Sequence, residues 1–392
     1  MKRLVAGTIL ALIVSNFSAT AVELEELPSC RVTATSCVPA KFLKQAGSKA
    51  LSDPAILVVD PTDLTELHFN RPDSPSIPAS VMKVLTSFTA LTYIGGTHQF
   101  KTSIHSVESS TALVLRGEKD PWLTMYRSVS EKYGPAYAPA LIAKALPREE
   151  LRAGTRIKRE IFYHGLYSSD IAGLTAHFKA RNVRITFTPI SKLEAETLSF
   201  APLGEIRSAS IDQMVEFSVL FSDNRLSQRL AEHAAKAHGY KPTVKGMQRT
   251  FEDALLTRTI GIDGLVIKDG SGLSKENRVT ARTVVELLRT IRDLPEYASI
   301  YNGLPKSGKS GTLKTRFKET APDAVGLIKA KTGWVNGTVS LAGYITAGEK
   351  ELVFAVLADR IPKYYSATLR ARASIDRMVG SLSNPRPVIT EQ

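Results

Sequence analysis

The chain is poor in the residues that build metal and redox sites. Only two cysteines, Cys30 and Cys37, occur among its 392 residues, and their spacing is not that of a C-x-x-C motif. None of the seven histidines belongs to an H-E-x-x-H pattern. The sequence therefore predicts neither a metal site nor a cofactor.

Long apolar runs are also missing, and the apolar stretch at residues 4–14 is too short to span a bilayer comfortably. It follows the positive pair Lys2 and Arg3 and precedes a small-x-small site at residues 19–21, which is the pattern of a secretory signal peptide. We expect residues 1–21 to direct secretion across the cytoplasmic membrane to the periplasm or cell wall. An uncleaved anchor is the alternative. In an oxidising compartment, the two cysteines would form one small disulfide loop.

Acidic residues are fewer than basic ones: the chain has 38 Asp and Glu but 51 Lys and Arg. Its formal net charge is therefore +13. Nucleic acid is the usual first partner to consider for such a basic protein. For an exported protein we expect no nucleic acid, and anionic wall polymers or lipid headgroups are better counterparts. Simple solubility explains the excess charge equally well.

Hydrophobic periodicity predicts an α+β fold in which helices cover an antiparallel sheet. Strand-like runs fall at residues 55–59, 64–69, 326–330, 339–346 and 352–357. Helix-like spacing falls at residues 38–47, from 79 onward, at 211–221 and at 366–379.

The middle of the chain is less regular and is interpreted as an inserted subdomain. It holds a helix-like run at residues 138–146 between two strand-like runs at 112–115 and 183–187. We expect a main domain formed by residues 22–106 and 201–381, an insertion at residues 107–200, and a flexible tail at 382–392.

The first of three short motifs is Ser80-Val81-Met82-Lys83, at the predicted start of a helix. Positions i and i+3 share a helix face, so the Lys83 amine can reach the Ser80 hydroxyl. A serine hydroxyl is a weak nucleophile without a base, and a lysine can serve as that base when burial lowers its pKa. Alone, the S-x-x-K pattern is more often a surface coincidence.

The second motif, Ser222-Asp223-Asn224, follows the predicted helix at residues 211–221. Its side chains can project into a cleft, where Ser222 could relay a proton from Lys83 to a leaving amine. Asn224 could hold the peptide backbone of a substrate. The same triplet is also a common turn or helix cap.

The third motif, Lys331-Thr332-Gly333, lies on a strand whose turn, Asn336-Gly337, is the favoured two-residue hairpin type. Gly333 lets a substrate approach the backbone closely, and Lys331 with the Thr332 hydroxyl could bind a carboxylate. Two K-S-G triplets, at residues 306–308 and 309–311, compete with this motif. They lie in a Gly-rich stretch without a strand pattern, which favours Lys331.

In this order and context, the three motifs define the penicillin-binding and serine β-lactamase set. The segments D-G-S-G-L-S at 269–274 and N-R-V-T at 277–280 are similar to a signature between the second and third motifs of one family. The chain thus resembles the class C low-molecular-mass penicillin-binding proteins, the D-alanyl-D-alanine carboxypeptidase/endopeptidase family, over most of residues 50–380. G-T-L at 311–313 also looks familial, which explains the K-S-G triplets.

The resemblance implies a role for each motif residue. Ser80 would be the acylated nucleophile and Lys83 its base, while Ser222, Asn224 and Lys331 would move protons and bind substrate. Peptidoglycan stem peptides are the implied substrates, and β-lactam antibiotics are the implied covalent inhibitors.

The strand residues complete the implied site. Thr332 would contact the terminal carboxylate of the substrate, which would lie along the backbone at Gly333. The backbone N–H groups of Ser80 and Trp334 would form an oxyanion hole. Trp334 stands where the family commonly has a small hydroxylated residue.

Two other functions remain as alternatives. A β-lactamase of the class A type needs a glutamate in an E-x-x-L-N context, and the nearest approach, at residues 252–256, lacks the asparagine. We therefore expect a long-lived acyl-enzyme with penicillin. The second alternative is a non-catalytic wall-binding module of the same fold.

Overall fold

The structure is a computed structural model that describes residues 38–151 and 158–383. The predicted signal peptide, the predicted disulfide between Cys30 and Cys37 and nearly all of the predicted tail lie outside the described residues. Within the described ranges, no helix is both long and apolar enough to cross a bilayer.

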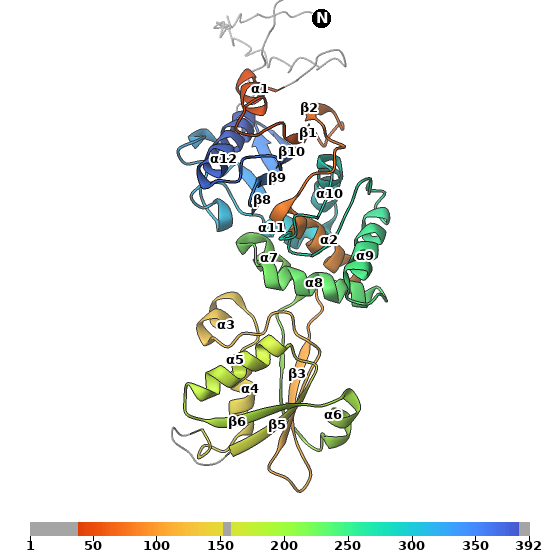
Figure 1. Ribbon diagram of the computed structural model, residues 1–392, viewed down its shortest axis with the longest axis vertical. Helices are drawn as coiled ribbons and strands as arrows, with labels where there is room; N and C mark the ends of the chain where they lie inside the picture. The colour runs from red at the N-terminus through yellow and green to blue at the C-terminus, as the bar shows by residue number, and fades with distance from the viewer. Residues whose placement is uncertain (1–37, 152–157, 384–392) are drawn as a thin grey trace, which may run out of the picture. The chain divides into compact units, whose positions relative to one another are not determined.

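A five-stranded antiparallel sheet forms the centre of the larger part of the chain (Figure 1). In spatial order its strands are β2 (Glu66–Asn70), β1 (Ala55–Val59), β10 (Lys350–Ala358), β9 (Thr338–Ala347) and β8 (Ile328–Val335). The pairing of β1 with β10 brings early and late parts of the sequence together. The predicted helix-covered antiparallel sheet is confirmed.

Two apolar cores cover the two faces of this sheet. The helices of the first core are α2 (Met82–Ile94), α7 (Ile211–Phe221), α8 (Asn224–Ala237), α9 (Val244–Leu256), α10 (Ala281–Asp293) and α11 (Ala298–Gly303). The helices of the second core are α1 (Ala40–Ala46) and α12 (Tyr365–Gly380). Because both faces are buried, β1 is apolar at every position instead of alternating.

A second five-stranded sheet is built by the middle of the chain. In spatial order its strands are β6 (Arg184–Pro189), β5 (Lys158–His164), β4 (Leu113–Gly117), β3 (Lys101–Ser106) and β7 (Pro202–Arg207). Its helices are α3 (Arg127–Tyr133), α4 (Ala138–Ala145), α5 (Ser168–Lys179) and α6 (Lys192–Leu198). The entering strand β3 and the leaving strand β7 pair with each other, so the sheet extends beyond the expected 107–200 insertion on both sides.

Buried charges join this second sheet's segment to α8. Arg229 of α8 donates to Asp170 at 3.1 Å, and its guanidinium lies 3.7 Å from the centroid of the Tyr167 ring. Beside them Asp120 is almost fully buried and accepts a 2.7 Å hydrogen bond from the Trp122 N–H. Burial raises the pKa of Asp120 to about 7, and the nearby Asp170 carboxylate adds to the effect.

Candidate active site

Ser80 lies in a turn that the backbone enters under strain. A 3-10 turn, Ala79–Val81, leads directly into α2, and Ala79 has a positive φ of 48°. A positive φ is costly for a residue with a Cβ, so the surrounding structure has to hold this turn in place. A Cβ built on Gly272 would lie 1.9 Å from the Ala79 carbonyl oxygen, so only glycine lets these two segments pack.

Lys83, one helical turn further along, is completely buried, and its amine is surrounded by oxygen atoms. Its Nζ lies 3.0 Å from Ser80 Oγ and 2.8 Å from Asn224 Oδ1, and it donates to the Ser271 carbonyl oxygen at 2.5 Å. Burial lowers the pKa of Lys83 to about 8, although nearby carboxylates, Asp269 first, oppose the shift. A lysine with this pKa is neutral often enough near pH 7 to take the proton of a serine hydroxyl.

One carboxylate organises the loop that supplies the Ser271 carbonyl. Asp269 accepts hydrogen bonds of 2.6–3.2 Å from four consecutive backbone N–H groups, those of Ser271, Gly272, Leu273 and Ser274. Partial burial opposes its ionisation, but these bonds and one from the Ser271 hydroxyl hold the pKa of Asp269 below its usual value. The D-G-S-G-L-S segment thereby fixes a carbonyl oxygen and a negative charge near Lys83.

The S-D-N triplet joins α7 to α8 at the edge of this cluster. Ser222 takes the left-handed conformation, with φ 60° and ψ 43°, and Asp223 caps α8 by accepting from the Leu226 N–H at 2.8 Å. Asn224 is thereby the first residue of α8, with its side-chain oxygen on Lys83. The Ser222 hydroxyl makes no hydrogen bond to Lys83, whose described bonds go elsewhere.

The K-T-G triplet runs along the edge strand β8 beside the nucleophile turn. A Cβ built on Gly333 would lie 2.7 Å from the Pro78 carbonyl oxygen, so glycine is what allows this strand to pass so close to Ser80. Side chains alternate along a strand, and Ala330 enters the second core. The fully buried Lys331 therefore lies on the other face of the sheet, with α2.

Two buried lysines consequently share the site. Burial, reinforced by the neighbouring Lys83, lowers the pKa of Lys331 well below its ordinary value, and its Nζ donates to the Thr332 carbonyl oxygen at 3.1 Å. The Thr332 hydroxyl lies 2.8 Å from the Thr312 hydroxyl. Among the described residues no carboxylate offsets the burial of Lys331, so an arriving carboxylate would supply its counter-charge and the arrangement favours an anionic substrate.

Trp334 continues β8 with its backbone and its side chain pointing in different directions. In a hairpin with a two-residue turn, the two residues that flank the turn, here Val335 and Thr338, form both backbone hydrogen bonds with each other. The backbone N–H of the preceding residue, Trp334, therefore points away from β9, to the free edge of the sheet. Its ring lies against α12, with the Arg372 guanidinium 5.5 Å from the centroid, and is 50% exposed. The bulk of the tryptophan is therefore on the face of the sheet opposite to Ser80.

The structure thus brings together most of the residues that the motifs predicted. Ser80, Lys83, Asn224 and Lys331 converge, whereas Ser222 lies at the rim. Among residues 38–151 and 158–383, no three His, Cys, Asp or Glu side chains are grouped as a metal site. A base next to a serine, an amide and a second amine can perform acyl transfer without a metal ion.

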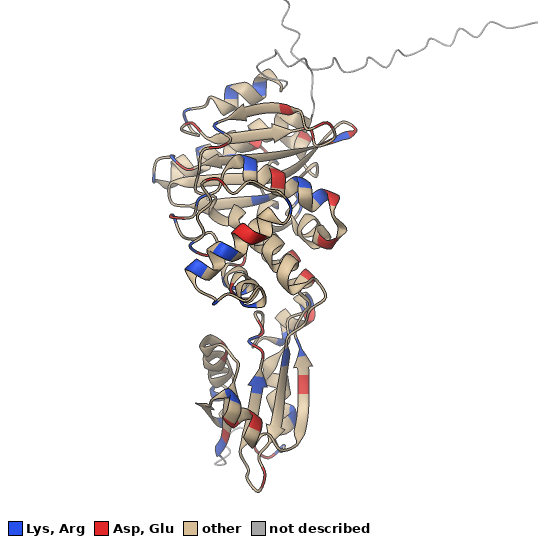
Figure 2. Ribbon diagram, turned by 90° about the vertical axis from the view of Figure 1, so that its right-hand side faces the viewer, with Lys and Arg blue, Asp and Glu red and all other residues tan. Residues whose placement is uncertain are grey.

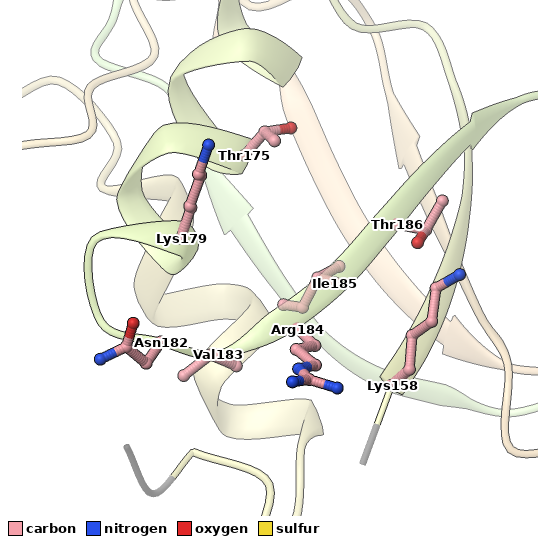
Figure 3. Close-up of a pocket in the computed structure, with 8 residues that line it drawn as sticks. All are labelled: Lys158, Thr175, Lys179, Asn182, Val183, Arg184, Ile185 and Thr186. Carbon is pink, nitrogen blue, oxygen red and sulfur yellow. The ribbon is translucent and has the colours of Figure 1, made fainter. Parts of the chain in front are cut away.

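A pocket of about 480 Å³ lies elsewhere, in the second sheet. Its lining residues are Lys158, Thr175, Lys179, Asn182, Val183, Arg184, Ile185 and Thr186. Figure 3 shows Thr175 and Lys179 on α5 and Arg184, Ile185 and Thr186 on β6. No motif residue lines this pocket, so it is separate from the candidate active site.

Sequence comparison adds independent support. The sequence profile of the D-Ala-D-Ala carboxypeptidase 3 (S13) family matches residues 41–130 and 182–383. The chain is 34% identical over 160 residues to a D-alanyl-D-alanine carboxypeptidase of Actinomadura sp. and 31% identical over 205 residues to carboxypeptidase DacB of Mycolicibacterium smegmatis. These matches cover 40% and 48% of this chain but only 29% and 44% of the two relatives.

Solved structures show the same fold at low sequence identity. Penicillin binding protein 4 of Haemophilus influenzae superposes with a TM-score of 0.66 at 14% identity, covering 88% of this chain and 99% of that one. A predatory endopeptidase of Bdellovibrio bacteriovorus, solved with an immunity protein, has a TM-score of 0.61 at 16% identity, covering 86% and 96%.

Proposed function

Because the chain belongs to the D-Ala-D-Ala carboxypeptidase 3 (S13) family, we propose that it is a serine D-alanyl-D-alanine carboxypeptidase that trims peptidoglycan stem peptides. One observation carries the proposal: the buried Lys83 amine, with a pKa of about 8, lies 3.0 Å from Ser80 Oγ. The distance is that of a hydrogen bond, and the lowered pKa gives the amine a neutral fraction that can take the serine proton near neutral pH. We place the enzyme in the periplasm or cell wall, with β-lactam antibiotics as covalent inhibitors and anionic wall polymers as partners.

In the first half-reaction, neutral Lys83 accepts the Ser80 hydroxyl proton while Oγ bonds to the carbonyl carbon of the penultimate D-alanine. The N–H groups of Ser80 and Trp334 stabilise the oxyanion, and losing one such donor typically raises the barrier by roughly 2.7–4 kcal/mol. The C–N bond then breaks as the proton passes to the leaving amine through the Ser222 hydroxyl, which comes within hydrogen-bond distance of Lys83 when substrate binds. D-alanine departs and the acyl-enzyme remains.

Substrate binding uses the second lysine and the edge of β8. The terminal carboxylate of the peptide pairs with Lys331 and accepts from the Thr332 hydroxyl, which restores the positive charge on the buried amine. Asn224 holds the peptide backbone from the opposite side, and the missing side chain at Gly333 leaves room for it.

Water resolves the ester in the second half-reaction, and this step separates the peptidase from a β-lactamase. Glu252, the nearest sequence match to a deacylating glutamate, lies on α9 and accepts from the Gln248 side chain at 2.7 Å. It makes no described hydrogen bond to Ser80 or Lys83. Without a dedicated base for water, the penicilloyl ester persists.

Intact-mass spectrometry after incubation with benzylpenicillin tests this function. We expect one stoichiometric adduct on the parent and none on Ser80→Ala. Ser366→Ala, an exposed serine at the start of α12, is the matched control and should be acylated like the parent. The same proteins should release D-alanine from a peptide ending in D-Ala-D-Ala in the same order of activity.

Two outcomes would overturn the proposal. An adduct that decays with turnover of the drug would identify a β-lactamase. No adduct, together with no D-alanine release at any pH between 5 and 10, would identify a non-catalytic wall-binding module.

A further inference from the structure

Exposed aromatic rings and cations gather where the end of β8 meets α12. We propose that this surface docks on a bilayer that contains anionic phospholipid. The docking face consists of Trp334, Lys363, Tyr364, Tyr365, Leu369 and Arg370.

The apolar members of the docking face are about half or more exposed to solvent. Tyr365 is 69% exposed, Tyr364 54%, Trp334 50% and Leu369 45%. Tyr365 and Leu369 are four residues apart, so they share one face of α12. The opposite face of the helix is buried in the second core, so folding alone does not require large apolar side chains on the solvent side.

Contacts join the segments that carry the docking face. The Arg372 guanidinium lies 5.5 Å from the Trp334 ring centroid, which connects α12 to β8. Arg370 donates to the Tyr364 hydroxyl at 3.1 Å. Lys363 packs against the β8–β9 turn, where a Cβ on the turn glycine would lie 3.4 Å from its Cγ.

The charge of the docking face is of one sign. Residues 363–377 contain four cations and a single acid, Asp376, which is buried and paired with Arg316. Positive residues occur over the whole described chain (Figure 2), so net charge alone does not locate a partner. On this face the cations stand among several exposed apolar side chains, three of them aromatic.

That combination favours a bilayer over a soluble polyanion. Lys and Arg are attracted to anionic headgroups. Tyr and Trp side chains prefer the depth of the headgroups, where the apolar ring contacts the acyl chains and the O–H or N–H group contacts water. A polymer of phosphates would use the cations but would gain little from burying Tyr365 and Leu369. The basic pocket of Figure 3 is the natural comparison, because three cations line it and no exposed aromatic ring does.

Co-sedimentation of the full chain with vesicles tests the proposal, using phosphatidylcholine with and without about one third phosphatidylglycerol. Lys363→Gln/Arg370→Gln should weaken binding to the anionic vesicles roughly 30-fold, because each cation near such a surface contributes about 1 kcal/mol. Tyr365→Ser/Leu369→Ser should weaken it by a factor of about ten or more. Every variant keeps the same N-terminal segment, so any affinity of that segment cancels in the comparison.

Two matched controls should bind like the parent: Lys158→Gln/Lys179→Gln in the pocket of the second sheet, and Leu193→Ser/Phe200→Ser, which replaces side chains 74% and 64% exposed. Circular dichroism confirms that all variants fold. The chain has two tryptophans, and Trp122 is buried, so a blue shift of emission on adding vesicles should disappear in Trp334→Phe.

Three results would overturn the proposal. The first is that the parent binds neither kind of vesicle. The second is that the controls lose as much affinity as the docking-face variants. The third is that the parent binds long-chain polyphosphate while Tyr365→Ser/Leu369→Ser leaves its vesicle binding unchanged, which would identify a soluble polyanion as the partner.

Discussion

The pH dependence of acylation tests the protonation state of Lys83. With a pKa of about 8, the neutral fraction of this amine is about 0.1 at pH 7 and about 0.9 at pH 9. Only the neutral amine can take the Ser80 proton, so the acylation rate constant should rise about tenfold over this interval and then level off. A lysine with the ordinary pKa of about 10.4 would still gain rate at pH 10.

Single-turnover acylation by a fluorescent penicillin measures this rate between pH 6 and 10, at drug concentrations that saturate binding. Asp269→Asn supplies the diagnostic variant. It removes a negative charge that raises the pKa of Lys83, so the midpoint of the pH profile should move to lower pH. Asp253→Asn on α9, whose carboxylate is bonded to His238 and Tyr240, is the charge-matched control and should leave the midpoint in place.

Two results would refute this reasoning. A midpoint above pH 9.5 in the parent would mean that Lys83 stays charged and that another group is the base. A midpoint near 8 that Asp269→Asn leaves unmoved would mean that the titrating group is not Lys83.

Three further predictions test the surroundings of the site. Gly333→Ala should abolish acylation, because its Cβ would lie 2.7 Å from a backbone oxygen, whereas Trp334→Ser, whose side chain is on the opposite face, should acylate nearly as fast as the parent. Gly272→Ala should lower the melting temperature, since a strained residue at φ 82° costs about 1–3 kcal/mol. Asp120 binds a proton more tightly when folded, so stability should fall as pH rises from about 4 to 7, by up to about 4 kcal/mol, and urea unfolding of Asp120→Asn should show no such loss.

Local sequence rules predicted the main sheet well. The apolar run at residues 55–59 and the Asn336-Gly337 turn locate β1 and the β8–β9 hairpin, and both features depend only on neighbours in sequence. The helices α8 and α10 are not predicted, because charged and polar residues dominate them. Both nevertheless carry an apolar stripe at helical spacing, which was the available signal in the sequence and was missed.

The second sheet shows why its limits escape a sequence analysis. Strands β3 and β7 pair although about one hundred residues separate them, and neither has a continuous apolar run. The parallel pairing of β4, β5 and β6 depends equally on distant partners. Long-range pairing of this kind has no local signature, so only the runs in β4, β6 and α4 were predicted.

In the candidate site, too, local contacts could be predicted from the sequence and long-range contacts could not. The spacing of Ser80 and Lys83 is fixed by the helix and can be predicted from four residues. The third partner of Lys83 is the Ser271 carbonyl oxygen, and a backbone atom leaves no mark in the sequence. The family-like D-G-S-G-L-S segment was the available signal, and the hydrogen bonds to Asp269 explain why that segment has its composition.

Strain at the nucleophile turn ties these observations together. Ala79 and Ser222 both have a positive φ without being glycine, and each lies within two residues of a hydrogen-bond partner of Lys83. Such conformations persist only where neighbours hold them, and here the close packing against Gly272 and Gly333 does so for the Ala79 turn. Each glycine lets a separate segment approach that turn, so the position of Ser80 depends on the loop of Asp269 and on the strand of Lys331 at once. The close packing of these segments therefore couples the Ser80 turn to the loop of Asp269 and to β8, while the helix itself keeps Ser80 next to Lys83.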